Sequence, residues 1–169
     1  MWGTLEDFNT ITKKGFQVKP YETNNKGVAP ISSLFQRQMH DSVTATTTMN
    51  YSTKSEKDLA GIVCYQSERF NYVFGVTKKD KDFYLVLQRT QKGQSKIIAS
   101  TKINVKNPIQ LQVRADGDDY KFNYSVEGSE FINLGGTVSG DILSTNVAGG
   151  FTGSLIGLYS TSMNDAQPE

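Results

Sequence analysis

The amino-acid sequence predicts an all-β fold, a sandwich or a barrel of short strands. Two observations lead to this prediction. Apolar residues recur at every second position in several short segments, as in strands with one buried and one solvent-facing side. Turn-forming residues separate these segments at intervals of about ten residues, which is typical of sandwiches and barrels. Helical periodicity is hard to find, and we expect one helical turn around Gly140–Thr145.

The first predicted strands follow an irregular N-terminal third, in which residues 19–27 have the composition of turn and loop. Residues 43–51 are dense in β-branched side chains, which favour a pleated surface. Residues 70–77 alternate apolar side chains with polar or small ones, and residues 83–88 resume the alternation after the charged tip 78–82. These two segments are therefore predicted to form a hairpin.

The next predicted strands, 109–114 and 120–126, flank the turn 115–119, where an Asp-Gly pair favours a tight reversal. Residues 127–130 make another turn before the short apolar segment 131–134.

The last long segment, 134–161, is rich in glycine and ends in a strand-like alternation. Phe151, Leu155 and Tyr159 share one predicted face with two glycines, and a Gly-Gly turn precedes them. The segment contains no group that could act on its own as an acid, a base or a nucleophile.

Length and charge set limits on the function. A chain of 169 residues is most simply one domain, so we predict a single domain over residues 1–169. The 18 Lys and Arg residues nearly balance the 17 Asp and Glu residues, which argues against nucleic-acid or anionic-membrane binding. No apolar stretch approaches the roughly 18 residues of a membrane span, and no signal peptide opens the chain. The compartment is not indicated.

The single cysteine, Cys64, lies in the apolar run 60–65. It cannot form an intrachain disulfide, and we expect a buried free thiol rather than a nucleophile. The abrupt start at Met1-Trp2-Gly3 fits either a true gene start or a domain cut from a longer chain.

Groups for catalysis are few. His40 is the only histidine, so a Ser-His-Asp triad or a histidine-based metal site is not expected, and we predict a structural or surface role for it. A glycosidase needs a pair of carboxylates at a suitable separation. The candidate carboxylates all lie in predicted turns, where acidic residues are common, so we expect no catalytic pair in this chain. They are Asp116, Asp118 and Asp119, Glu56 and Asp58, and Asp80 and Asp82.

No cofactor is expected. Structural calcium is conceivable because sandwiches often bind it through loop oxygens. Asp7, Asp141 and Asp165 are conceivable donors, although they show no familiar ligand spacing.

Aromatic side chains suggest two roles, since buried rings fill a core and exposed rings stack on sugars. The rings in the alternating segments 70–74 and 120–124 are predicted to point inward. Trp2, Tyr21 and Phe151, in predicted loops, are the candidates for sugar contact.

Several segments together resemble one known module. They are 33–40, 59–66, the strand around Tyr72, 120–129 with Leu134-Gly135, 149–153 and 156–159. Their order and spacing resemble the C-terminal concanavalin A-like β-sandwich of family 43 glycoside hydrolases, the β-xylosidase and arabinofuranosidase group. The resemblance extends over about residues 2–161 and implies an antiparallel two-sheet β-sandwich, a concanavalin A-like jelly roll.

The resemblance implies an accessory, non-catalytic domain, because the catalytic carboxylates of that family lie on a β-propeller that precedes the sandwich. The implied partners are that propeller in the same polypeptide and a plant-type oligosaccharide or polysaccharide. Phe151 matches the Phe-Thr-Gly position that reaches the active-site rim in some members. Arg37, Gln38 and His40 match a polar strand that would face the propeller or the substrate pocket.

Three alternatives stay open from the residues alone. The chain could be a free-standing carbohydrate-binding module for xylan-type polysaccharide, with exposed aromatics and amides on a concave sheet. It could be a purely structural or oligomerisation domain. A complete small glycosidase is the least favoured, because no acid/base pair can be named. The natural sugar and the oligomeric state are not indicated.

Overall fold

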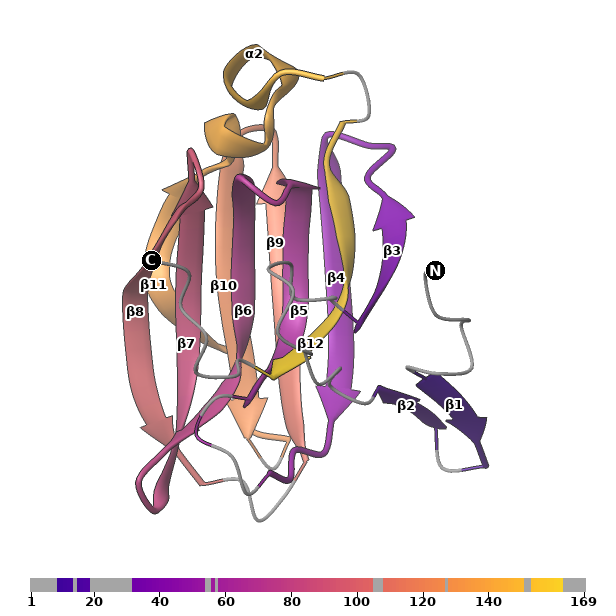
Figure 1. Cartoon of the computed structure of the whole chain (residues 1–169), viewed down its shortest axis with the longest axis vertical. Helices are drawn as coiled ribbons and strands as arrows, with labels where there is room; N and C mark the ends of the chain where they lie inside the picture. The colour runs from indigo at the N-terminus through magenta and orange to yellow at the C-terminus, as the bar shows by residue number, and fades with distance from the viewer. Residues whose placement is uncertain are drawn as a thin grey trace, which may run out of the picture.

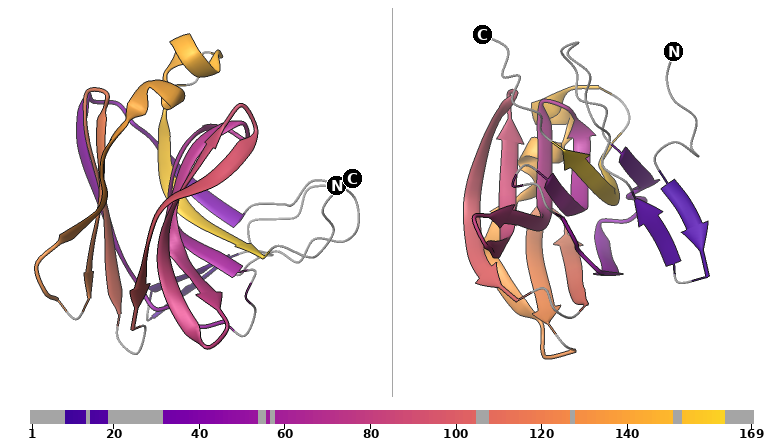
Figure 2. Two further views of the ribbon diagram at one scale, coloured as in Figure 1. Left: turned by 90° about the vertical axis from the view of Figure 1, so that its left-hand side faces the viewer. Right: turned by 60° about the horizontal axis from the view of Figure 1, so that its bottom comes forward.

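The computed structural model describes residues 9–13, 15–18, 32–53, 56, 58–104, 108–126, 128–150 and 153–162. It confirms the prediction of an antiparallel two-sheet β-sandwich (Figures 1 and 2). The strands are β1 (Asn9–Thr12), β2 (Gly15–Val18), β3 (Ser32–Arg37), β4 (Ser42–Met49), β5 (Asp58–Ser67), β6 (Phe70–Lys79), β7 (Asp82–Gln91), β8 (Gln94–Ile103), β9 (Ile109–Asp116), β10 (Asp119–Val126), β11 (Ile132–Ser139) and β12 (Leu155–Ser162).

The two sheets of the sandwich differ in size. The six-stranded sheet has the order β3-β12-β5-β6-β7-β8, and the four-stranded sheet has the order β11-β10-β9-β4. Figure 2 shows them stacked face to face. Strands β1 and β2 pair with each other as a separate hairpin, which stands apart from both sheets in Figure 1.

The core lies between the two sheets and follows from the period-two alternation. In β9 the odd-numbered residues Ile109, Leu111, Val113 and Ala115 are buried, whereas the even-numbered ones are half-buried or exposed. The predicted inward aromatics are confirmed, because the rings of residues 70, 72, 74, 120 and 122 are buried and that of residue 124 packs against the core. Cys64 is confirmed as a buried free cysteine.

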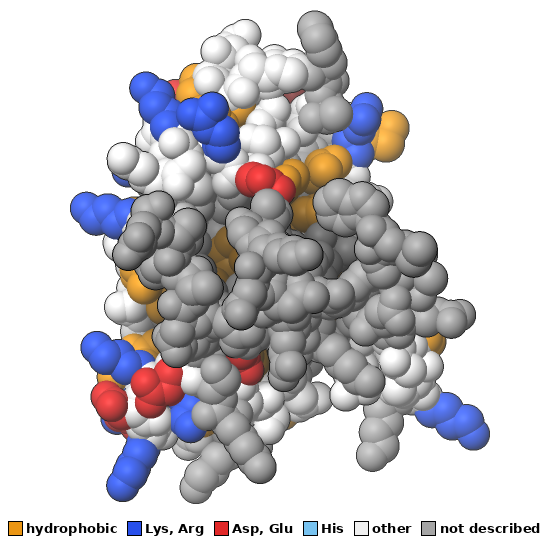
Figure 3. Space-filling view, viewed as in Figure 1, with side chains coloured by type: hydrophobic (Ala, Val, Ile, Leu, Met, Phe, Trp, Pro, Cys, Tyr) orange, Lys and Arg blue, Asp and Glu red, His pale blue; other side chains and the backbone are white. Residues whose placement is uncertain are grey.

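The six-stranded sheet is also covered on its outer side. Leu59, Val63, Val73 and Val86 form a second buried cluster there, since they alternate along their strands with residues of the main core. In Figure 3 the Lys and Arg side chains lie around the periphery of this view, several of them together at the upper left, and the Asp and Glu side chains lie at the lower left and nearer the centre.

The turns agree in part with the prediction. Residues 70–79 and 82–91 form the expected hairpin, with Asp80 at a positive φ of 56°. The Asp-Gly turn joins β9 to β10, and Gly117 has a positive φ of 55°. One helical turn was expected after β11, and the structure has two there, the 3-10 turn η1 (Gly140–Leu143) and the α-helical turn α2 (Thr145–Ala148). They cover one end of the sandwich in Figure 2, with Ile142 and Leu143 buried in the core.

Several boundaries differ from the prediction. The last strand, β12, begins at Leu155, and Phe151, where the predicted alternation starts, lies outside the described residues. Neither β8 nor the β1–β2 hairpin was predicted. The prediction that all the acidic candidates lie in turns is wrong for four of them. Asp58, Asp82, Asp116 and Asp119 are terminal residues of strands, because backbone pairing continues past the point where the side chains become polar. Among the described residues, no helix is both long and apolar enough to cross a membrane.

Candidate functional site

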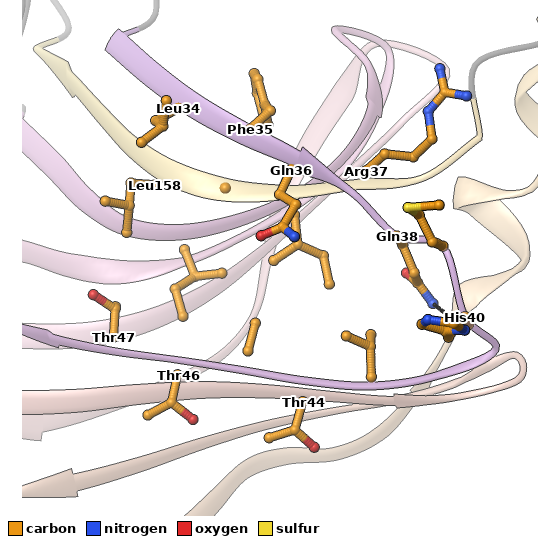
Figure 4. Close-up of a pocket in the computed structure, with 16 residues that line it drawn as sticks. Leu34, Phe35, Gln36, Arg37, Gln38, His40, Thr44, Thr46, Thr47 and Leu158 are labelled. Carbon is orange, nitrogen blue, oxygen red and sulfur yellow. Dashed lines mark hydrogen bonds between the residues drawn. The ribbon is translucent and has the colours of Figure 1, made fainter.

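A groove of about 800 Å³ opens between β3 and β4 (Figure 4). These strands are edge strands of the two sheets, because β3 pairs with β12 and β4 pairs with β9, each on one side. The groove floor is apolar and includes Ile62, Ile156 and Leu158 of the six-stranded sheet and Val43 and Ala45 of β4.

Strand β3 contributes both apolar and polar side chains to the same groove. Leu34 lies at the groove rim, with half of its surface exposed. Gln36 and Thr47 point into the groove, whereas Arg37 points away from it (Figure 4). Since side chains alternate along β3, its even-numbered residues face the groove and its odd-numbered ones face outward.

One end of the groove is closed by the connector between β3 and β4. The backbone N–H of Gln38 donates to the carbonyl of Ser154 at 3.0 Å, and the buried Tyr120 donates its hydroxyl to Gln38 Oε1 at 2.7 Å. Gln38 in turn donates through Nε2 to the carbonyl of His40 at 3.2 Å (Figure 4). The connector is thereby tied to both β10 and the residues that enter β12.

A second set of hydrogen bonds holds the cap of η1 and α2 on the sandwich. Gln66, with 8% of its surface exposed, donates through Nε2 to the carbonyl of Gly149 at 2.5 Å. The buried Tyr72 donates its hydroxyl to the carbonyl of Ser139 at 2.9 Å, where η1 begins. Gly149 and Gly150 have φ values of 74° and 78°, which favour glycine, so the chain reverses here after α2.

The tyrosine hydroxyls at this end stay protonated and act as donors. Burial raises the pKa of Tyr120, and its hydrogen bonds with Ser154 and Gln38 offset part of that rise. Burial likewise raises the pKa of Tyr72, against an opposing effect of Arg89. As donors, the Tyr72 hydroxyl holds the backbone at Ser139 and the Tyr120 hydroxyl holds the Gln38 side chain.

The described chain offers little catalytic chemistry. No carboxylate lines the groove, and among the described residues no group of His, Cys, Asp and Glu could hold a metal ion. Burial raises the pKa of Cys64 strongly, which keeps its thiol protonated. The arrangement can bind and position other groups through apolar contact, amides and hydroxyls.

The residues predicted for the site fall into two groups. Arg37, Gln38 and His40 all line the groove or its end. Phe151, Trp2 and Tyr21 lie outside the described residues, as do the calcium candidates Asp7 and Asp165. Asp141 is an exposed residue of η1, and calcium binding stays a prediction.

Gln66 and Tyr120 were not predicted to form polar contacts at this end. Gln66 follows Ile62 and Cys64 on the inward face of β5, and a glutamine that continues an apolar alternation could have been noticed. Its partner could not, because the hydrogen bond joins residues 83 positions apart.

Comparisons with known proteins agree on one module. Residues 17–168 match the family model described as the beta xylosidase C-terminal concanavalin A-like domain. The chain is 24% identical, over 98% of its length, to the non-reducing end alpha-L-arabinofuranosidase BoGH43B of Bacteroides ovatus, of which it covers 30%. It is also 24% identical, over 79% of its length, to the xylosidase/arabinosidase 43B of Humicola insolens, of which it covers 27%.

Solved structures show the same similarity. A GH43_12 protein retrieved from the capybara gut metagenome superposes with a TM-score of 0.84 and is 42% identical. The match covers 95% of this chain and 31% of that one. The Bacteroides ovatus xyloglucan PUL GH43B superposes with a TM-score of 0.83 over 92% of this chain and 31% of its own, at 24% identity, a likeness of fold. The chain thus spans about a third of the length of these relatives.

Proposed function

The chain belongs to the family of β-xylosidase C-terminal concanavalin A-like domains, and from this premise we propose that it is an accessory, non-catalytic domain of a family 43 glycoside hydrolase. In this proposal it packs on the catalytic domain of the same polypeptide and helps to shape the active-site pocket. The reaction belongs to that other domain, and this domain acts by position.

The observation that carries the proposal is the anchored end of the sandwich. On the N-terminal side of Phe151, Gln66 and Tyr72 tie the cap of η1 and α2 to the six-stranded sheet. On its C-terminal side, Ser154 accepts from the Gln38 backbone just before β12. Fixed positions on both sides lower the entropic cost of presenting a side chain from between them. We assign that side chain to Phe151.

The β1–β2 hairpin supports contact with another domain. Ile11 and Phe16 are cross-strand partners, and 85% and 37% of their surfaces are exposed. A two-stranded hairpin with an uncovered apolar pair is marginally stable on its own. Burial of this pair against a neighbouring domain would stabilise both the hairpin and the interface.

For the substrate we propose a pentose-containing plant glycan. The support comes from the names of the relatives, which include an alpha-L-arabinofuranosidase and a xylosidase/arabinosidase. The chain covers about a third of each or less, so their activities enter here as a proposal.

The test uses the complete natural polypeptide. Phe151→Ala and the anchor variant Gln66→Ala should each raise KM for an aryl β-xyloside or an aryl arabinofuranoside more than they change kcat. Ser100→Ala, at an exposed position in the second half of β8, is the matched control and should leave both constants unchanged.

Three results would overturn the proposal. One is a natural reading frame that encodes no catalytic domain upstream of this one. Another is hydrolysis of an aryl xyloside by the 169-residue chain alone. The third is a stable dimer of the isolated chain formed through the hairpin, which would favour the structural and oligomerisation alternative; sedimentation of an Ile11→Ser variant would reveal that route.

A further inference from the structure

The outer face of the four-stranded sheet has an ordered set of amides and hydroxyls. In β9 the residues between the buried ones point to this face, which places Gln110 and Gln112 there. On β4 the same argument places Thr46 and Thr48 outward, and Figure 4 shows Thr46 pointing away from the groove.

One row of side chains crosses all four strands. Thr46, Gln112, Asn123 and Asn133 are register partners on β4, β9, β10 and β11. Gln112 Nε2 donates to Thr46 Oγ1 at 3.2 Å, Asn123 Nδ2 donates to Gln112 Oε1 at 3.3 Å, and Asn133 Nδ2 donates to Asn123 Oδ1 at 3.0 Å. We call these four residues the amide row.

The amide row holds its side chains in fixed orientations with hydrogen-bonding capacity to spare. Each amide has two donor hydrogens and two acceptor lone pairs, and the row uses part of them. The neighbouring rung adds Gln110 Nε2, which lies 3.4 Å from its acceptor Thr48 Oγ1. The remaining donors and acceptors face solvent at the spacing of adjacent strands, about 4.8 Å.

A hollow of about 340 Å³ continues the row on its other side. Thr44 and Arg114 are register partners one rung beyond Thr46 and Gln112. Lys121 on β10 is the register partner of Arg114. In the last rung Ser42 Oγ donates to Asp116 Oδ1 at 2.5 Å. The lining contains Arg114, Lys121, Asp116 and Asp119, so its cationic and anionic groups are equal in number.

We propose that the amide row and the adjoining hollow bind a neutral polysaccharide. This site is separate from the proposed pocket-shaping end and does not depend on it. Sugar hydroxyls are both donors and acceptors, and amides match both roles. The balanced charges of the hollow offer no net attraction to an acidic polymer.

A protein partner fits this face less well than a glycan. The exposed large apolar side chains of the described chain include none from the amide row or the hollow, whereas protein interfaces depend on buried aromatic and aliphatic anchors. Phe131, two positions before Asn133 and 42% exposed, could stack on a sugar ring at the end of this face.

The test is titration calorimetry of the 169-residue chain with a soluble neutral arabinoxylan. The double variant Gln112→Ala/Asn123→Ala should weaken binding by about tenfold, because it removes side chains that would make at least two hydrogen bonds to the ligand. The control pair Gln94→Ala/Ser100→Ala, at exposed positions of β8 on the other sheet, should leave binding unchanged.

The outcomes separate this site from the proposed function. Absence of binding to the natural chain overturns the polysaccharide site and leaves the accessory role intact. Binding that survives the amide-row variant but is lost on substitution of Leu34 at the groove also overturns it. If the alanine variant does not fold, Gln112→Glu replaces it, because it keeps the shape of the side chain; it should likewise weaken binding of the arabinoxylan. Hydrolysis of a small aryl glycoside by the complete polypeptide should be unaffected by either variant.

Discussion

Gly157 lies in β12 beneath the ring of Phe35, which reaches across from β3 toward Tyr65 of β5. The Phe35 and Tyr65 ring centroids are 5.1 Å apart. A Cβ on residue 157 would lie 2.7 Å from Phe35 Cδ1 and would overlap the Leu34 carbonyl oxygen. The absence of a side chain here therefore allows β3 to pair closely and the two rings to meet.

Gly157→Ala should destabilise the domain through this overlap. Forcing one methyl group into a packed site typically costs about 1–3 kcal/mol, and we expect a loss in that range in the free energy of unfolding. Urea denaturation monitored by far-UV circular dichroism measures this loss of unfolding free energy. Ser100→Ala, at an exposed position of β8, is the control and should change the midpoint little. An unchanged midpoint for Gly157→Ala would show that β3 is not held as described.

Cys64 offers a second residue-scale prediction. Its side chain is fully buried in the core, and burial raises the pKa of the thiol, so both access and thiolate formation are suppressed. The native chain should react with a disulfide reagent only at the rate at which the core opens, and the urea-unfolded chain should react at once. Rapid labelling without denaturant would contradict the buried position.

At the scale of elements, the β3–β4 connector joins the sheets at one end of the groove. Tyr120 of β10 reaches Gln38 with its hydroxyl, and the Gln38 backbone bonds to Ser154 before β12. One phenol thus links the four-stranded sheet to the edge of the six-stranded sheet. It also packs closely on Gly140, where a Cβ would overlap the ring.

Tyr120→Phe removes this hydroxyl and keeps the ring. Gln38 Oε1 then loses the uncharged hydroxyl that donates to it, which should lower the unfolding free energy by about 1 kcal/mol. Tyr124→Phe on the same strand is the matched control. Hydrogen exchange of the Gln38 amide should also speed up in Tyr120→Phe. Equal stability of the two variants together with unchanged exchange would mean that the connector is held by its backbone alone.

The elements that could be predicted from the sequence are those with one apolar and one polar face. Strands β6, β7, β9 and β10 alternate clearly because each contributes side chains to the core between the sheets. Strand β8 escaped prediction because it lies at a sheet edge and many of its side chains are exposed. The β1–β2 hairpin escaped for a similar reason, since its exposed residues give no buried face to detect.

The candidate site was harder to predict than the strands. The resemblance identified Arg37, Gln38 and His40; Gln38 and His40 lie at the closed end of the groove, whereas the Arg37 side chain points away from it. The contacts of Gln66 with Gly149 and of Tyr120 with Gln38 join positions more than eighty residues apart. Such pairs depend on which strands become neighbours, and the alternation of a single strand contains no information about its neighbours.

At the scale of the whole molecule, the sandwich depends on buried phenols. Burial raises the pKa of Tyr51, Tyr65, Tyr72, Tyr120 and Tyr159 above the ordinary value of 10.0, and Cys64 behaves in the same way. In every case burial is the largest cause, because a phenolate or thiolate would lose its hydration in the core. Tyr72 and Tyr120 come from different sheets and are buried between them, whereas Tyr65 and Tyr159 pack on the outer side of the six-stranded sheet. Ionisation of the first two is therefore coupled to separation of the layers, and ionisation of the other two to loss of packing on the outer side.

This arrangement predicts alkaline unfolding. A group whose pKa is higher in the folded than in the unfolded state keeps its proton at a pH at which the unfolded chain has lost it. Its contribution to stability is complete below the unfolded pKa, which is 9.0 for the thiol and 10.0 for the phenols, and falls as pH rises toward the folded value. The urea midpoint should therefore be lower at about pH 10.5 than at about pH 8, and the unfolded state should show the phenolate absorbance first.

The phenols can be separated from other alkaline effects by one substitution. Tyr120→Phe lowers stability at neutral pH but removes one titrating group. The difference in unfolding free energy between this variant and the natural chain should therefore become smaller as pH rises through the range in which phenols ionise. The Lys102–Asp82 ion pair, at 2.7 Å on the surface, also weakens at high pH, and Lys102→Ala measures that part. The contrary result is a urea midpoint that falls with pH equally in the natural chain and in Tyr120→Phe but stays constant in Lys102→Ala. It would assign the loss of stability at high pH to surface charge and contradict the role of the buried phenols.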